Sequence, residues 1–418
     1  MVRLVASFAP LLFGVCLLAT GHGFLSTLLS VRLSVAGYTG EIAGLVMSCF
    51  YLGLIAGSFW AKGFISYIGH IRYLVLIMTV FAAVAFLHSL FMSPWLWGVL
   101  RLVGGFCMAG SFVAVESWLN AKADNTQRGK LLAVYIMIAY LSVGSGQKLL
   151  TIGDITDVQL FWLAGSLIAF SVIPVLLTRI PPPPPPSQQR INIGLLLRSS
   201  PLGMSGAIVS GILLGAFYSV LPRYGDKVGL DTEGISLLMQ CGFFGGMLFQ
   251  LPIGWISDRC GRRSVITAVS IGLGFFSAIL TVATVTASDP TVFTSVSFLS
   301  AVFLFGGLLF VVLPLSVSCA NDRADSQSFE STAGTLNLLN AAGSWAGALI
   351  VSIFMDLIGP PGFFVSTALC ALLMVLLCIW NRTAEGQEKH RAKSDAAGSL
   401  YYPPSDPEEQ HAEEGHAR

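Results

Sequence analysis

Long apolar runs dominate this sequence and constrain its fold more than any other feature. A helix that crosses a lipid bilayer needs about 20 mostly apolar residues. Only helices and closed barrels satisfy their backbone hydrogen bonds within lipid, so runs of this length predict an all-α polytopic membrane protein with 12 transmembrane helices. The runs lie near residues 5–31, 41–60, 72–92, 94–117, 130–149, 159–178, 201–221, 235–254, 264–285, 291–314, 331–354 and 362–380.

Composition agrees with a membrane protein and argues against several other classes. Only 11% of the residues are charged, against about 25% in soluble domains. The net charge is +1, which gives no sign of nucleic-acid binding. The eight cysteines are scattered, without a spacing typical of a metal site or a disulfide framework. We therefore expect no metal and no cofactor.

The distribution of Lys and Arg predicts the topology. With the N-terminus inside, 18 of the 23 fall on the inner side, 4 on the outer side, and Arg101 within a run. This predicts a multi-pass protein of the inner (cytoplasmic) membrane with both termini cytoplasmic. The first run follows Arg3 as a signal peptide would, but it is longer than a signal core and lacks a cleavage site, so we expect a retained helix.

Six consecutive prolines at 181–186 mark the middle of the chain. Polyproline is a semi-rigid spacer, here of roughly 19 Å. It predicts a six-helix bundle over 1–180, a cytoplasmic linker over 181–200 and a second six-helix bundle over 201–380. The polar tail, 381–418, lacks apolar periodicity and is predicted to be a disordered cytoplasmic segment.

The two halves resemble each other. An offset of 192 residues places "KGFISYIGHIR" (62–72) on the turn around 258–263, with Gly69 on Gly261. An offset of 202 aligns "RLVGGF" (101–106) with "FLFGGL" (303–308), and keeps a glycine pair that close helix packing would require. We interpret what both halves share as architecture, and what one half alone has as a candidate for function.

The most charged segment is "QLPIGWISDRCGRR", residues 250–263. One hypothesis is anchoring, with the arginines at the lipid–water boundary. The other is a cytoplasmic gate, in which the carboxylate and the arginines pair with each other and with neighbouring helix ends. The first-half copy has lost these charges, so such a gate would be one-sided. The candidate residues of the turn are Gly254, Asp258, Arg259, Gly261, Arg262 and Arg263.

Twelve runs, the 6+6 repeat and this turn together resemble the major facilitator superfamily. The turn fits the superfamily pattern G-x-x-x-D-R/K-x-G-R-R/K at every specified position. Gly146-Gln147, "QLPIG" (250–254), "LPLSVSCANDR" (313–323), and Glu116 twelve residues before Arg128 resemble the YcaD-type branch of bacterial permeases. The resemblance implies two bundles that line a central cavity, and it favours the gate for the turn.

Two charges lie within the run at 94–117. Arg101 is about 10 Å deep, where a charge is costly unless it faces the interior or water. It either extends to the outer surface or lines the cavity and binds an anionic group. Glu116 lies about 22 Å further along the helix, so it cannot contact Arg101. We expect it to join the gate by pairing with Arg128 or Arg72.

Other polar residues in the runs are candidates for the cavity or for coupling, and each could instead form an inter-helix hydrogen bond. Imidazole titrates near neutral pH, so the histidine between Gly21 and Gly23 is the best candidate for a proton carrier. These residues are His22, Tyr51, Gln147, Tyr218, Gln240, Asn337 and Asn340.

The sequence therefore predicts a secondary active transporter that moves a small solute by alternating access, coupled to protons. No ATP-binding loop of the G-x-x-x-x-G-K-[ST] type is present, so a gradient must supply the energy. An uncoupled facilitator or a drug efflux antiporter is the alternative, although the region 139–150 lacks the proline typical of antiporters. An intramembrane enzyme, on the weak "GMSG" match at 203–206, or a non-transporting sensor is more remote. We expect a monomer in the bilayer, with an unknown substrate and no enzymatic activity.

Overall fold

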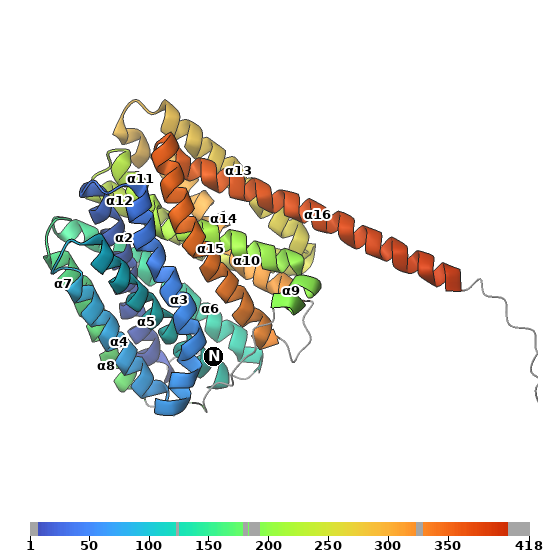
Figure 1. The fold of residues 1–418 in the computed structure, drawn as a ribbon, viewed down its shortest axis with the longest axis horizontal. Coiled ribbons are helices and arrows are strands. Elements are labelled where there is room, and N and C mark those ends of the chain that lie inside the picture. The colour runs from blue at the N-terminus through green and yellow to red at the C-terminus, as the bar shows by residue number, and fades with distance from the viewer. Residues whose placement is uncertain (1–6, 123–124, 179–182, 184–192, 323–328, 400–418) are drawn as a thin grey trace, which may run out of the picture.

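The computed structural model describes residues 7–122, 125–178, 183, 193–322 and 329–399 (Figure 1). Every regular element within these ranges is a helix. Twelve candidate spans in the described residues are long and apolar enough to cross a membrane. The predicted fold class is therefore confirmed.

The first half supplies six spans, of which the last two are each built from two consecutive helical segments. Their bounds are α2 (Ala9–Val35), α3 (Gly40–Ile68), α4 (His70–Leu87), α5 (Pro94–Lys122), α6 (Asn125–Gly146) with η1 (Gln147–Ile152), and α7 (Gln159–Phe170) with α8 (Val172–Leu176).

The second half repeats this order with three short additional elements. Its bounds are α9 (Ile193–Ser199), α10 (Pro201–Ser219), α11 (Leu221–Lys227), α12 (Thr232–Cys260), α13 (Arg262–Thr286), η2 (Pro290–Thr294), α14 (Val296–Asn321), α15 (Phe329–Ile358) and α16 (Gly362–Ser399).

The internal repeat is visible in the helix bounds. Helices α3 and α12 each contain 29 residues, and α12 begins 192 residues after α3. Each ends at a glycine with positive φ, 82° at Gly69 and 85° at Gly261, a conformation that glycine adopts at no steric cost. Helix α14 begins 202 residues after α5. Both offsets found in the sequence therefore correspond to a structural repeat.

The repeated glycine pairs allow close helix packing, as expected. A Cβ atom on Gly105 of α5 would lie 1.9 Å from the carbonyl oxygen of Phe50 in α3. A Cβ atom on Gly306 of α14 would lie 2.4 Å from the carbonyl oxygen of Gly242 in α12. Any larger side chain would separate these helices in either half.

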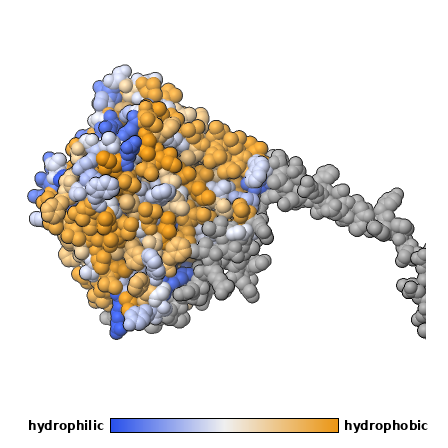
Figure 2. Space-filling view, in the orientation of Figure 1, coloured by the Kyte–Doolittle hydropathy of each residue, from blue (hydrophilic) through white to orange (hydrophobic). Residues whose placement is uncertain are grey.

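Each half has its own apolar core, one mainly from α2–α8 and one mainly from α10–α16. The halves pack together chiefly through α3 against α15 (Figure 1). A second contact is made by α6 with η1 against α12. Much of the visible outer surface is hydrophobic, and hydrophilic groups gather where α3 begins and α11 lies (Figure 2). This end is called the Arg223 end below, and the opposite end, where α3 and α12 finish, is called the Asp258 end.

The helix bounds differ from the predicted boundaries at two places. The tail was predicted to be disordered from 381, but α16 continues to Ser399 and projects away from the bundles (Figure 1). Residues 381–399 include four Ala, two Glu, two Lys and two Arg and no proline, and these residue types favour a helix. Within the predicted linker, Ile193–Ser199 forms α9. Residues 179–182, 184–192 and 400–418 lie outside the description.

Candidate functional site

A cavity of about 410 Å³ lies between the two bundles, within the size range of small-molecule sites. Its wall comes from α2, α3, α5 and α6 in the first half and from α10, α14 and α15 in the second. Along α5 the lining runs from Arg101 to Glu116, so the cavity extends from the middle of the bundles toward the Asp258 end. Phe112 and Ile136, which line that part, are exposed.

Arg101 lies at the deep part of the cavity and is 3% exposed. Its Cζ atom is 4.4 Å from the ring centroid of Phe50, a cation–π contact worth about 0.5–2 kcal/mol. Its Nε atom is buried without a hydrogen-bond partner, and no ion pair joins it to any residue within the described ranges. Burying a cation costs several kcal/mol, so Phe50 alone does not compensate this charge.

His22 also stacks on Phe50, with 4.8 Å between the ring centroids. Its glycine neighbours explain its position on α2. Gly21 packs against Ile168 of α7 and Gly23 against Val143 of α6, which leaves His22 directed into the cavity wall. Its Nδ1 atom is buried and lacks a hydrogen-bond partner.

The repeat shows that the two walls differ in chemistry. His22 corresponds to Leu214 and Ser26 to Tyr218 at the offset of 192, and all four line the cavity. The basic side chains of the lining therefore come from the first half. The second half supplies Tyr218 and two amides, Asn337 and Asn340.

The two amides are available to different degrees. Asn340 Nδ2 donates to the carbonyl oxygen of Ala207, at 3.1 Å. Asn337 is exposed to the cavity and has no hydrogen bond to another residue in the part of the chain that the structure describes. Tyr51, also predicted for the cavity, lines it next to Phe50.

Glu116 lines the cavity near the Asp258 end, beside Tyr135 of α6. Of the two partners predicted for Glu116, Arg72 forms no ion pair with it, and none of the ion pairs between described residues includes Glu116. The side chain of Arg128 lies outside the described residues. Helix rotation explains the difference, since α5 turns Glu116 toward the same cavity that Arg101 lines.

Two further predicted residues lie outside this lining. Gln147 is fully buried where η1 begins, and its Nε2 donates to the carbonyl oxygen of Val143 at 2.9 Å. Gln240 Nε2 donates to Ser236 Oγ one turn earlier on α12, at 2.8 Å. The NH₂ groups of both amides therefore bond within or next to their own helix, whereas Gln147 Oε1 is buried without a partner among the described residues.

The charged turn at the Asp258 end ties α12, α13 and α14 together. Arg262 Nη1 is 2.5 Å from Asp258 Oδ1, and Arg262 Nε is 3.0 Å from Asp322 Oδ2 at the end of α14. Arg259 stacks on Trp255, with Cζ 3.6 Å from the ring. All these contacts lie within the second bundle.

The other turn residues contribute mainly backbone geometry. Gly261 supplies the positive φ between α12 and α13, and Arg263 follows in the first turn of α13. Gly254 has open space around it, so packing does not require a glycine there. In the first-half copy, His70 occupies the place of Arg262, and its Nε2 is hydrogen-bonded to Ser117 Oγ of α5 at 2.9 Å.

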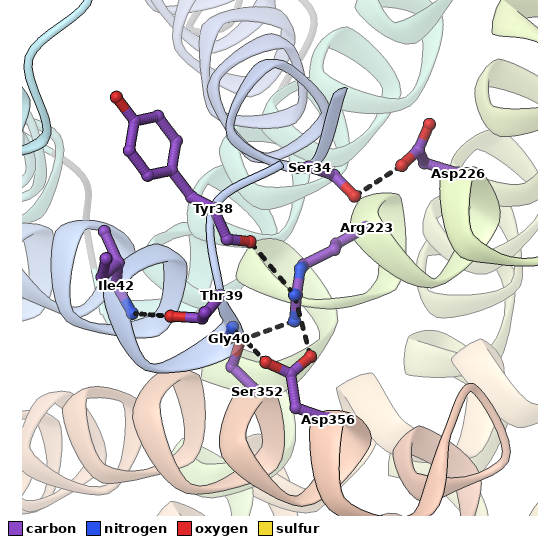
Figure 3. A network of polar contacts seen from close by, with 9 residues as sticks. All are labelled: Ser34, Tyr38, Thr39, Gly40, Ile42, Arg223, Asp226, Ser352 and Asp356. Carbon is purple, nitrogen blue, oxygen red and sulfur yellow. Dashed lines mark hydrogen bonds and ion pairs between the residues drawn. The ribbon is translucent and has the colours of Figure 1, made fainter. Parts of the chain in front are cut away.

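The Arg223 end holds a second polar network, which the sequence analysis did not identify (Figure 3). Arg223 of α11 is 2% exposed and its Nη2 is 2.8 Å from Asp356 Oδ1 of α15. The same Nη2 donates to the carbonyl oxygen of Tyr38 at 3.4 Å. The Asp356 carboxylate also accepts a hydrogen bond from the backbone N–H of Gly40, at the start of α3. A pair within the second bundle thus holds the α2–α3 connection of the first.

Three more contacts join the bundles at this end. Ser34 Oγ donates to Asp226 Oδ2 at 2.5 Å, and Ser30 Oγ donates to the carbonyl oxygen of Ser219 at 2.6 Å. Lys148 Nζ is 2.7 Å from Glu233 Oε1. Ser34 and Asp226 are 192 residues apart, so equivalent positions of the repeat meet where the bundles touch.

Arg32 has a similar role within the first bundle. Its Nη1 donates to the carbonyl oxygen of Ile155 at 2.5 Å. The backbone N–H and hydroxyl of Thr156 lower the pKa of the neighbouring Asp154 carboxyl, and Arg32 lowers it further. The carboxylate beside Arg32 therefore stays ionised at neutral pH.

Two six-helix bundles of repeated topology around a central cavity define a polytopic membrane protein built for passage of a solute. The chain matches the Major Facilitator Superfamily over residues 11–348 and again over 204–401. It belongs to this superfamily of membrane transporters.

Relatives and solved structures agree with this assignment. The chain is 28% identical to the uncharacterized MFS-type transporter YcaD of Salmonella typhimurium and of Salmonella typhi, over 89% of this chain and 94% of theirs. Its fold is similar to that of the nucleoside transporter NupG, with a TM-score of 0.70 and 15% identity over 89% of this chain and 98% of that one. A bacterial homologue of the human lysosomal transporter Spinster, in an inward-facing and unoccupied conformation, matches with a TM-score of 0.62 and 12% identity over 90% of this chain and 95% of its own.

Proposed function

We propose that this protein is a secondary transporter that moves a small solute by alternating access, driven by a proton gradient. One observation carries the proposal. A cavity walled by both bundles is bounded at the Arg223 end by contacts between the bundles, and its lining continues toward the Asp258 end. Rocking of the bundles about such a cavity would expose it to each side in turn.

The direction of the opening follows from the predicted topology. With the N-terminus inside, the Arg223 end faces outward and the Asp258 end faces the cytoplasm. The structure then corresponds to an inward-open form, in which the Arg223 network is the closed outer gate. The Asp258 turn is the proposed inner gate. Here its ion pairs lie within the second bundle, as expected when that side is open.

Solute movement tests the transport function directly. Right-side-out and inverted vesicles with and without the protein are incubated with a cell extract, and their contents are compared by mass spectrometry. A solute that accumulates or disappears only with the protein supports transport, and a pH gradient applied or collapsed reports coupling. If vesicles with and without the protein had identical contents in both orientations, the proposal would be contradicted. If the flux did not depend on the pH gradient, the protein would be an uncoupled facilitator.

Distance measurements test alternating access separately. Glu41 of α3 and Lys227 of α11 are exposed, lie at the Arg223 end and belong to different bundles. Spin labels at these positions, in a chain whose native cysteines are replaced, should give two distance populations by double electron–electron resonance. A single population that does not respond to the transported solute would contradict alternating access.

A further inference from the structure

The deep part of the cavity holds a positive charge for which the described residues supply no ion pair. Arg101 is buried, its Nε atom has no hydrogen-bond partner, and its ring contact is with an uncharged Phe50. His22, which stacks on the same ring, has a buried Nδ1 that also lacks a partner among the described residues. Two unsatisfied polar groups of the first bundle thus border one region of the cavity.

A counter-charge from outside the protein would resolve this imbalance. Arg presents a planar fork of donors that matches carboxylate and phosphate oxygens. The repeat supports a role in binding, because Phe303 occupies the equivalent place in α14 and packs against Phe249. The second half repeats this helix packing without a cation, so packing does not explain why an arginine is present at 101.

The rest of the lining restricts the shape of the ligand. The cavity, about 410 Å³, is far larger than an inorganic anion needs. Opposite the basic wall, Tyr218 is held by ring contacts with Phe217 and Phe243, and Leu214 adds an apolar surface. The amide of Asn337, which has no hydrogen-bond partner among the described residues, is suited to a neutral polar group.

The far end of the cavity limits the number of charges. Glu116 lines that part without an ion-pair partner among the described residues. A carboxylate there would repel a second anionic group that extended along α5. The cavity lining therefore has one cation at the deep end, an uncharged middle and one acidic side chain toward the Asp258 end.

We infer that the transported solute is a small organic anion, whose single carboxylate or phosphate binds Arg101 beside His22 and whose apolar or aromatic body lies against the wall formed by Leu214 and Tyr218. This inference rests on the proposed transport function and names its substrate class. The anionic group contacts the first bundle and the body contacts the second, so the bound solute bridges the two halves that must move together.

Matched ligands test the charge preference in the purified full-length protein. Benzoate and phenylphosphonate are compared with uncharged benzamide and cationic benzamidinium, within a wider panel of aliphatic and aromatic carboxylates paired with their carboxamides. Binding is measured by thermal shift and by calorimetry. We expect at least one anion to bind about tenfold or more tightly than its neutral isostere, as charge-assisted hydrogen bonds to Arg would give. A carboxylate and a phosphonate of equal body distinguish the two anionic groups.

Variants connect the preference to the residue. Arg101→Leu should remove the anion preference, and Arg101→Lys should retain it more weakly. Arg72→Leu removes an exposed cation of the same bundle outside the cavity and should leave the preference for anions unchanged. Size-exclusion chromatography and circular dichroism confirm that each variant is folded.

Three results would overturn the inference: no anion of the panel binds better than its isostere, Arg101→Leu keeps the preference, or Arg72→Leu loses it. Because binding is measured without a gradient, this failure differs from failure of transport. Transport of a neutral solute would contradict the inferred substrate class but would leave the proposed transport function intact. An anion that binds at Arg101 but never crosses in vesicles would contradict the proposed function.

Discussion

Arg223 and Asp356 form an ion pair of 2.8 Å at the place where the α2–α3 connection of the first bundle meets the second. Arg223 is almost completely buried, whereas the Asp356 side chain is 33% exposed. The carboxylate also accepts the N–H of Gly40 at the positive end of the α3 dipole. The pair therefore joins two elements of its own bundle and at the same time holds the other bundle.

Asp356→Asn should destabilise the form that is closed at the Arg223 end. The substitution leaves a buried cation without its partner, which we expect to cost about 1–3 kcal/mol of that form. The population open at this end should then rise by about 5- to 150-fold. Double electron–electron resonance between labels at 41 and 227 should show a longer distance.

Glu233→Gln provides the matched control. It removes another carboxylate that joins the bundles at the same end, but the Lys148–Glu233 pair is more than half exposed on both sides. Exposed pairs contribute at most about 1 kcal/mol, so the distances should change little. Equal shifts in both variants would mean that burial of Arg223 does not matter for the gate.

Gly40→Ala should interfere with the same gate through sterics. A Cβ atom there would lie 2.4 Å from the carbonyl oxygen of Ser352 and 2.7 Å from the Asp356 carboxylate. The oxygen of Ser352 belongs to a helix backbone and cannot move aside alone, so α3 and α15 must separate. We expect a longer 41–227 distance and a slower exchange of the transported solute.

Gly63→Ala, in the same helix, is the control for this substitution. A Cβ atom at Gly63 meets nothing within 4 Å, and alanine favours the helix by about 0.4–1 kcal/mol. Transport should be unchanged and thermal stability equal or slightly higher. If Gly40→Ala behaved in the same way as Gly63→Ala, close approach at the start of α3 would not be needed for closure.

The sequence predicted features that depend on local chemistry. The twelve spans follow from apolar length, and the turn at Gly69 and Gly261 follows from a repeated pattern whose backbone needs positive φ. Arg101 stands out because it is a cation within an apolar run. Each of these signals lies within a few residues of the feature it predicts.

The features that were missed depend on how the bundles dock. The network around Arg223 combines the start of α3, the middle of α11 and the end of α15, and no local pattern relates these segments. In the sequence, Arg223 was recognised only as one of the four Lys and Arg residues predicted on the outer side. Glu116 was assigned to the gate because its depth was known but its rotation about α5 was not.

Arg262→Ala should impair the proposed inner gate without unfolding the protein. Asp258 and Asp322 are both more than half exposed, so loss of their shared partner should cost less than about 1 kcal/mol of stability. Asp258→Asn should have a smaller effect, because Asp322 still binds the arginine. We expect the flux of the solute identified in vesicles to be lowest in Arg262→Ala, intermediate in Asp258→Asn and highest in the parent.

Arg72→Ala is the control at this end, since Arg72 is exposed at the start of α4. Flux at the parental rate in Arg262→Ala would reduce the turn to an anchor. A loss of the same size in Arg72→Ala would indicate a general effect of surface charge.

Glu116→Gln should uncouple transport from the proton gradient while solute still crosses. Glu116 lines the cavity toward the Asp258 end, where it is within reach of water, and Tyr135 is the titratable side chain that faces it from α6. With no described cation to pair with, the carboxyl group can exist as acid or carboxylate according to the state of the gate.

Gln keeps the size and the hydrogen-bonding oxygen of Glu116 but cannot carry the coupled proton. Flux in proteoliposomes is measured with and without a pH gradient at equal protein amounts, with Tyr135→Phe as the control for the neighbouring hydroxyl. We expect the parent and Tyr135→Phe to respond to the gradient and Glu116→Gln to ignore it. If Glu116→Gln still concentrates the solute against its gradient when protons flow, another group carries the proton, and His22→Gln is the next variant to measure.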